Sequence, residues 1–195
     1  MKNIFSINLL ILIIAISCVE KNEEIQITGN QKIEMRNAAS EFMGRLKSIL
    51  IKQIKTKGML SAVAVCSDTA QVLTNDFGLM KGIYIRRVSF KNRNKLNVPD
   101  EFEAKVLKGF EQTKNEGKLT TNIEHFEIIK QNEHQYLRYM KPIELGAVCL
   151  KCHGNKENIS AEVKDLIAKR YPDDKAVGYK SGDLRGAVSI KKLID

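Results

Sequence analysis

The spacing of apolar and polar residues along the chain predicts helices in its first part and strands further on. From Ile33 to Ile54 apolar side chains recur every three or four positions, as on the buried face of an amphipathic helix, and Gly58 is placed to end that helix. A second helical stretch is expected from Met59. Its apolar face consists of Met59, Ala62, Val63, Cys66, Ala70 and Leu73. Cys66 is therefore expected to point into the protein.

Four later segments have the composition or the alternation of β-strands. Gly82 to Phe90 is rich in β-branched and aromatic residues. Ile123 to Lys130 and Gln135 to Ile143 flank a polar turn at Asn132-Glu133, which predicts an antiparallel hairpin. Arg185 to Lys191 supplies the last strand.

Two more helices are expected between and after these strands. Pro99 stands at a first helical position before an acidic turn, and Gly117 closes that helix. Ser160 can cap a further helix that Pro172 stops. Helices followed by an antiparallel sheet that helices interrupt predict an α+β fold with long N-terminal helices.

The first residues have the proportions of a secretory signal. Lys2 is followed by an apolar core from Leu9 to Ile16 and by the small residue Ser17. This core is too short for a comfortable membrane-spanning helix. Residues 1–17 are therefore expected to be a signal peptide, and the chain is expected to be exported.

Cys18 adds an expectation about the membrane. The stretch from Ala15 to Cys18 looks like a bacterial lipoprotein cleavage box, in which the cysteine becomes the lipidated first residue. Ordinary signal cleavage near Ser17 is the alternative. With lipidation, residues 18–30 form a tether, and the protein is periplasmic and anchored to a bacterial membrane, because each buried methylene contributes about 0.8 kcal/mol.

Composition narrows the classes of function. Residues 31–195 have a length that suits one compact domain. The chain has 32 Lys and Arg against 23 Asp and Glu, a formal net charge of +9. In an exported protein this excess indicates a solvated face or a docking surface for an acidic partner, and no nucleic acid is expected. The chain has no nucleophile-base pair, paired acids or phosphate loop, so we do not expect an enzyme.

The most informative motif is Cys149-Leu150-Lys151-Cys152-His153. Two thiols three residues apart can add across the two vinyl groups of a haem, and the histidine that follows can bind the iron. The motif therefore predicts one covalently attached c-type haem, with Cys149 and Cys152 as attachment residues and His153 as an axial ligand.

A zinc site and a redox dithiol are the alternatives for this motif. Zinc would need a further soft or imidazole ligand, and Cys18, Cys66, His125 and His134 form no second C-x-x-C. A thioredoxin-type dithiol would lie near the start of a βαβ unit, whereas this motif lies late in the chain, behind Gly146. Haem is the better interpretation.

Several motifs together resemble a known family. They are Arg86-Arg87-Val88-Ser89, Asn92-Arg93-Asn94, Asn97-x-Pro99-Asp100, the stretch from Cys149 to Gly154, Tyr171-Pro172-x-Asp174-x-Ala176-x-Gly178-Tyr179, and Gly182-Asp183-x-Arg185-Gly186. In order and spacing they resemble a family of exported haem c proteins with a PAS-like α+β fold, found alone or fused to signalling modules. The resemblance begins near Met35 and reaches the C-terminus, and it implies a PAS-like haem c domain over residues 31–195.

The resemblance also implies a second iron ligand. In the family, a cysteine at the place of Cys66 is thought to bind the iron opposite the histidine. By chemistry alone His125, His134 and the methionines compete with it, and Met140 is the most plausible methionine. The family usually continues after the cysteine with an alanine-proline pair, whereas this chain has Asp68-Thr69-Ala70-Gln71.

Nearby charged residues have candidate roles around a haem. Arg86, Arg87 and Arg185 are candidates for the haem propionates, because a guanidinium pairs with a carboxylate through two hydrogen bonds. The alternative is that they are ordinary exposed arginines. Asp174 and Asp183 are expected to order turns.

Ligation by histidine and thiolate has functional consequences. The anionic sulfur stabilises ferric iron, so the reduction potential is expected to be low, and strong ligands at both positions disfavour an oxidase or a peroxidase. We therefore expect a membrane-tethered monohaem protein that exchanges electrons with a periplasmic redox partner. The alternative is a redox-sensing or gas-sensing haem module that signals through a separate partner protein.

Overall fold

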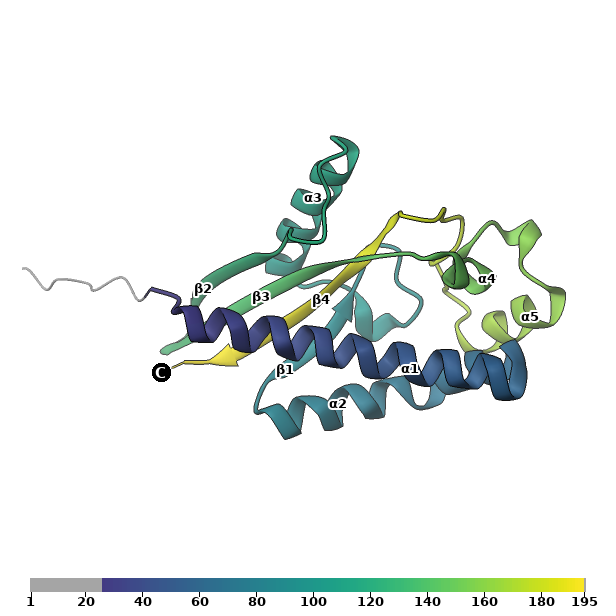
Figure 1. The fold of residues 1–195 in the computed structure, drawn as a ribbon, viewed down its shortest axis with the longest axis horizontal. Coiled ribbons are helices and arrows are strands. Elements are labelled where there is room, and N and C mark those ends of the chain that lie inside the picture. The colour runs from purple at the N-terminus through teal and green to yellow at the C-terminus, as the bar shows by residue number, and fades with distance from the viewer. Residues whose placement is uncertain (1–25, 195) are drawn as a thin grey trace, which may run out of the picture.

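The computed structural model describes residues 26–194 and has a four-stranded antiparallel sheet with helices on both faces (Figure 1). The long helix α1 and helix α2 lie along one face, and α3 lies against the other. The predicted signal peptide, the lipidation residue Cys18 and most of the predicted tether lie outside the described residues. The α+β fold that the sequence predicts is confirmed, and the arrangement is consistent with a PAS-like fold.

Helix α1, Gly29–Asp68, combines the first two predicted helices. It begins with a capping box, in which Thr28 and Gln31 satisfy each other's backbone N–H groups, so the helix starts within the predicted tether. At Gly58 the backbone has φ 81° and ψ −179°, a conformation that is essentially restricted to glycine. The predicted end of the first helix is therefore confirmed: the chain turns back at Gly58, which brings the side chains of Ser61 and Gln53 within 3.0 Å, and a second helical segment follows within α1 (Figure 1).

Helix α2, Ala70–Lys81, follows α1 directly after Thr69. Thr69 keeps the helical hydrogen bonds, since its N–H donates to the carbonyl of Val65 and its carbonyl accepts from the N–H of Leu73, both at 2.9 Å. The predicted helical face therefore runs on through Ala70 and Leu73. Gly82 ends α2 in the left-handed conformation, with φ 62°.

The strands agree with the sequence pattern. They are β1 (Tyr84–Val88), β2 (His125–Gln131), β3 (His134–Glu144) and β4 (Leu184–Leu193), in the order β1-β4-β3-β2. Strands β2 and β3 form the predicted hairpin, and the first turn residue, Asn132, has a positive φ of 56°, as two-residue hairpin turns favour.

Alternation along the strands gives the sheet two apolar faces. The face under α1 and α2 is formed by Met35, Ala38, Ala39, Phe42, Phe77, Ile83, Ile85, Leu137, Tyr139, Val188 and Ile190. The opposite face, under α3, is formed by Val88, Val106, Leu107, Phe110, Met140 and Ala187. Neighbouring residues of one strand therefore belong to different cores, which decides where the strand arginines point.

Helix α3, Glu101–Asn115, starts two residues later than Pro99 at the first helical position would require. Asp100 is the N-cap and forms a capping box with Glu103, so Pro99 precedes the cap. The predicted end of the helix is confirmed by Gly117, which has φ 69°.

Short helices, α4 and α5 among them, lie toward the end of the molecule opposite the C-terminus (Figure 1). They are η1 (Lys95–Asn97), η2 (Ala147–Cys149), α4 (Leu150–His153), η3 (Lys156–Asn158) and α5 (Ala161–Arg170). Val163 and Ile167 of α5 pack with Val63, in the part of α1 that follows Gly58. No helix within residues 26–194 combines the length and the apolar character needed to cross a bilayer.

Candidate functional site

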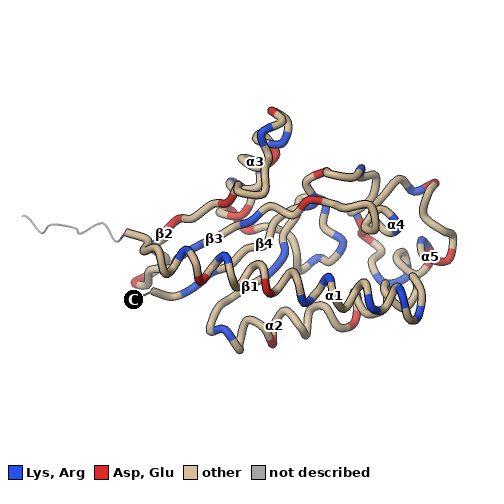
Figure 2. Tube along the Cα trace, in the orientation of Figure 1, with Lys and Arg blue, Asp and Glu red and all other residues tan. Residues whose placement is uncertain are grey.

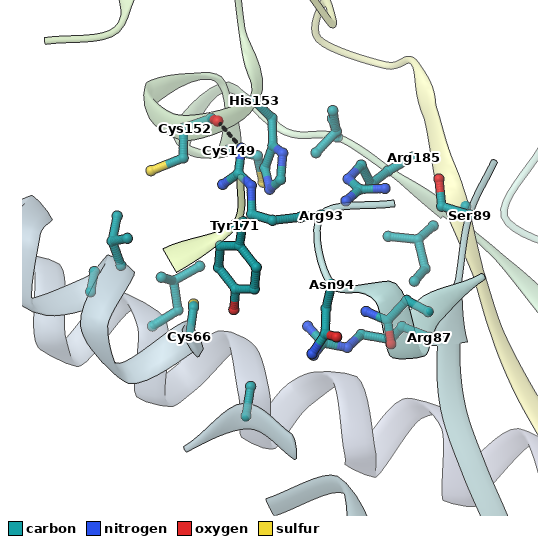
Figure 3. A pocket seen from close by; sticks show the side chains of 18 of the residues that line it. Cys66, Arg87, Ser89, Arg93, Asn94, Cys149, Cys152, His153, Tyr171 and Arg185 are labelled. Carbon is teal, nitrogen blue, oxygen red and sulfur yellow. Dashed lines mark hydrogen bonds between the residues drawn. The ribbon is translucent and has the colours of Figure 1, made fainter. Parts of the chain in front are cut away.

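A cleft lies where the C-terminal part of α1, the adjacent ends of β1 and β4, the loop after β1 and the Cys149–His153 turn meet (Figure 3). Its volume is about 240 Å³, and it is partly open to solvent. This is below the roughly 300–1,000 Å³ of typical ligand pockets, so a larger guest would also occupy the open side. The cleft brings together residues that are far apart in the sequence.

The C-x-x-C-H motif forms one wall of this cleft. Helices η2 and α4 follow each other directly, so Cys149 and Cys152 lie on one tight turn and both line the cleft as half-buried free thiols. Burial raises the pKa of the Cys152 thiol, and the guanidinium of Arg93 opposes this. The sulfur of Cys152 is 3.7 Å from that of Met59 on α1.

The imidazole of His153 is prepared to act as a neutral ligand. Its Nδ1 is 2.7 Å from the carbonyl oxygen of Ala176. A carbonyl can only accept, so Nδ1 carries the proton and Nε2 keeps a free lone pair. Burial lowers the pKa of His153 to about 3, and the cations of Arg93 and Arg185 add to this effect. A neutral imidazole with an oriented second nitrogen is typical of metal-ligating histidines.

Cys66 lies on the opposite wall, which α1 provides (Figure 3). It points into the cleft together with its neighbours on the predicted apolar face, and its side chain stays exposed there. Surrounding protein nevertheless removes much of its water, and this burial raises the pKa of the thiol against the opposing effect of Arg87 and Arg93. Sulfur and imidazole thus face the same cleft from two sides.

The other predicted candidates for the second ligand do not line the cleft. Met140 is fully buried on the opposite face of the sheet, beneath α3. His125 is bonded to Glu127 on β2, and His134 is exposed at the hairpin turn. Two methionines that the sequence did not favour, Met43 and Met59 of α1, do line it.

Two of the three predicted propionate partners lie in the cleft. The guanidinium of Arg87 forms no hydrogen bond or ion pair with any residue from 26 to 194, and that of Arg185 donates to the carbonyl of Lys91 at 3.0 Å. Burial lowers the pKa of both arginines, and for Arg185 the neighbouring cations Arg93 and Arg87 contribute. Buried cations without a carboxylate are unfavourable, so this wall favours an anionic guest.

Arg86 is not part of the cleft, which corrects the prediction that it binds a propionate. Neighbouring residues of a strand point to opposite faces, and Arg86 of β1 lies on the α3 face. Its guanidinium is 3.3 Å from the buried carboxylate of Glu103 and donates to the carbonyl of Val98.

Arg93 is a cleft residue that was noted in the sequence only as part of a motif. Its guanidinium pairs with Asp174 at 3.0 Å and donates to the carbonyl of Cys152 at 2.7 Å. These partners are far away in the sequence, so no local pattern could have identified them. Asp174 and Asp183 order turns, as expected, by accepting from the backbone N–H groups of Ala176 and Lys180.

The donor set has a definite chemical character. Two thiols on one turn can hold a group covalently, a neutral imidazole and a thiol on facing walls can bind a metal, and Arg87 and Arg185 can pair with carboxylates. No cluster of three or more His, Cys, Asp or Glu side chains that could hold a bare metal ion occurs between residues 26 and 194. The residues fit an organic group that carries its own metal and acidic substituents.

Comparisons with known proteins identify similar chains. The family model described as Tll0287-like matches residues 16–192. The chain is similar to the crystal structure of a cyanobacterial haem protein, Tll0287, with a TM-score of 0.62 and 22% sequence identity, over 87% of this chain and 98% of that one. At this identity the likeness concerns the fold. No curated protein matches the chain significantly.

Proposed function

The chain belongs to the Tll0287-like family, and we propose that it binds one haem covalently, as a c-type haem protein. The observation that carries the proposal is the wall formed by Cys149, Cys152 and His153, on which both thiols and an oriented, neutral imidazole share one turn. The similarity in fold to Tll0287, a cyanobacterial haem protein, supports it.

Each residue of the cleft then has a role. Cys149 and Cys152 attach the haem through thioether bonds, and His153 offers Nε2 to the iron. Cys66 offers sulfur from the facing wall. Arg87, which has no carboxylate partner among residues 26–194, and Arg185 hold the propionates. The bound haem would supply a one-electron carrier whose iron alternates between ferric and ferrous forms.

Electron transfer is the function that this ligand set supports best. Thiolate ligation favours ferric iron and a low reduction potential, and two strong ligands leave no vacancy for oxygen chemistry. We therefore propose a carrier and not an enzyme. The proposal includes export and lipidation at Cys18, so that the domain works in the periplasm on a membrane-attached tether.

A basic strip on α1 supports a negatively charged redox partner. The strip consists of the exposed residues Lys47, Lys52, Lys55 and Lys57. No acidic residue occurs between Glu41 and Asp68, and none of the four lysines forms an ion pair within the described part of the chain. Met43, Leu50 and Ile54 of the same helix line the cleft, so a partner on the strip would dock close to the haem (Figure 2).

A sensor is the second candidate, and the surroundings of Cys66 favour it. This thiol is exposed within the cleft, and burial raises its pKa, which favours a neutral sulfur over a strongly bound thiolate. If the sulfur leaves the iron on reduction, a small gas molecule could bind there. A separate signalling protein would then read the change.

Carbon monoxide binding to the reduced, haem-loaded protein distinguishes the two candidates. A carrier with two retained ligands binds it slowly or not at all, because no position on the iron is free. Rapid binding, followed as a shift of the haem absorption after mixing, would replace electron transfer with sensing.

A further inference from the structure

Arg93 joins the loop after β1 to the backbone of Cys152, next to His153 (Figure 3). Its Nε and Nη2 donate to the two carboxylate oxygens of Asp174 at 3.1 and 3.0 Å. The same Nη2 also donates to the carbonyls of Cys152 at 2.7 Å and Ala176 at 3.3 Å. The side chains of Arg93 and Asp174 are only 13% and 10% exposed, so this is a buried, two-pronged ion pair.

Asp174 extends this connection to His153. Its second contact is with the backbone N–H of Ala176, at 2.9 Å, and the carbonyl of the same Ala176 accepts from Nδ1 of His153 at 2.7 Å. The ion pair therefore contacts both the N–H and the carbonyl of Ala176, the residue whose carbonyl orients the imidazole.

The segment from Asp174 to Tyr179, here called the return segment, is otherwise held to α4 by backbone bonds. The N–H of Tyr179 donates to the carbonyl of His153 at 3.0 Å, and that of Gly178 to Gly154 at 2.8 Å. These bonds fix the distance between the return segment and the motif. The ion pair additionally fixes Ala176, whose side chain is fully buried.

We propose that Arg93, through its pair with Asp174, is a positioning residue for His153. It holds the carbonyl of Ala176 in place, and this carbonyl sets the plane of the imidazole that faces the iron. The inference rests on the proposed haem site, and it assigns a role to a residue that neither attaches nor ligates the haem. Such second partners of a ligating histidine fix its tautomer and ring orientation.

The pair can be tested with Arg93→Gln, Asp174→Asn and the double variant in the full chain, expressed with a haem c maturation system. Three quantities are measured: covalent haem by intact mass, the reduction potential, and the width of the low-spin ferric signal in electron paramagnetic resonance. Arg36→Gln, Glu124→Gln and their double variant are matched controls, because this ion pair lies outside the cleft.

A positioning role of the Arg93–Asp174 pair and a purely electrostatic effect predict different results for these variants. A positioning role predicts a broader low-spin signal in both single variants and in the double variant, since a loosened ring adopts a range of orientations. It also predicts that the double variant keeps an altered potential. Arg93→Lys, which keeps the charge but not the fork, should broaden the signal as well. The Arg36 and Glu124 controls should match the wild type.

If the variants act only through their change in charge, the results contradict the proposal and can be recognised. Removing a cation and removing an anion would shift the potential in opposite directions, the double variant would return to the wild-type value, and every signal would stay sharp. Asp174→Asn has nearly the same shape as the native residue, so it remains informative if Arg93→Gln fails to fold. A wild-type chain without covalent haem would instead refute the proposed function.

Discussion

Cys66 is the residue whose role has the largest effect on the chemistry of the cleft. It lies on α1, facing the wall that carries His153, whereas Met140 is shut away beneath α3. Proposed as the second ligand, its sulfur would add a negative charge to the iron, which stabilises the ferric form.

Replacing Cys66 with serine should therefore change the ferric absorption spectrum and raise the reduction potential. Met140→Leu is the control and should leave both unchanged, because Met140 does not line the cleft. An unchanged spectrum in Cys66→Ser would move the ligand to Met59 or Met43, which do line it.

Arg87 and Arg86 allow a matched test of the proposed propionate site, because Arg87 lines the cleft and its neighbour Arg86 does not. Arg87 has no carboxylate partner among residues 26–194, so its charge opposes folding until an anion arrives. Arg87→Gln should stabilise the haem-free variant Cys149→Ala/Cys152→Ala and destabilise the loaded protein, by about 1–3 kcal/mol in each case.

Arg86→Gln should instead lower the stability of both forms, since it breaks the contact with buried Glu103 whether or not haem is present. Thermal unfolding of Arg87→Gln and Arg86→Gln, each in the loaded and in the haem-free protein, measures these changes in stability against the two parent proteins. Destabilisation of the haem-free protein by Arg87→Gln would contradict the assignment.

The residues proposed to attach and ligate the haem could be identified from the sequence, but the surrounding side chains could be identified only in part. Cys149, Cys152 and His153 are recognisable because their chemistry depends on positions within one turn. Arg86 and Arg87 must point to opposite faces of a strand, but which face holds the cleft depends on packing that the local sequence does not contain. Arg93 escaped a functional assignment because its partner, Asp174, is distant in the sequence.

At the scale of elements, the break in α1 at Gly58 matters most. Gly58 has a conformation that other residues rarely adopt, and the residues after it carry Met59 and Cys66 into the cleft. Because glycine commonly ends helices, the break at Gly58 could be predicted from the sequence. The continuation of the helical face from Met59 through Ala70 could be predicted as well, because the apolar pattern persists there and Thr69 keeps its helical hydrogen bonds.

Gly58→Ala should lower the free energy of unfolding by about 1–3 kcal/mol, because alanine is strained at this φ and ψ. Gly44→Ala in the same helix is the control. Gly44 has an ordinary helical backbone and free space around its Cβ position, so this change should stabilise the protein by up to about 1 kcal/mol. Chemical denaturation measures both, and equal effects would mean that the break at Gly58 is not intrinsically strained for alanine.

At the scale of the whole molecule, charge is unevenly distributed around the cleft. The basic strip lies on α1, while the charged residues of α3 lie across the sheet (Figure 2). Fields of this kind speed the approach of an oppositely charged partner and weaken as salt shortens the screening length from about 10 Å at 0.1 M to about 3 Å at 1 M.

Lys52→Glu/Lys55→Glu should therefore slow the oxidation of the ferrous protein by hexacyanoferrate(III) several-fold at low salt, and the difference should shrink at high salt. Lys105→Glu/Lys108→Glu on α3 makes the same change in net charge and should have a smaller effect. Equal slowing by both variants, followed by stopped-flow absorption, would show that net charge and not the strip controls the encounter.

The central claim is covalent attachment of one haem, and intact mass spectrometry tests it most directly. The full chain and the variant Cys149→Ala/Cys152→Ala are expressed side by side with a haem c maturation system and denatured before measurement. The account predicts that the wild-type chain gains the mass of one haem that denaturation does not remove, while the variant gains none. An unmodified wild-type chain with both thiols free would contradict it.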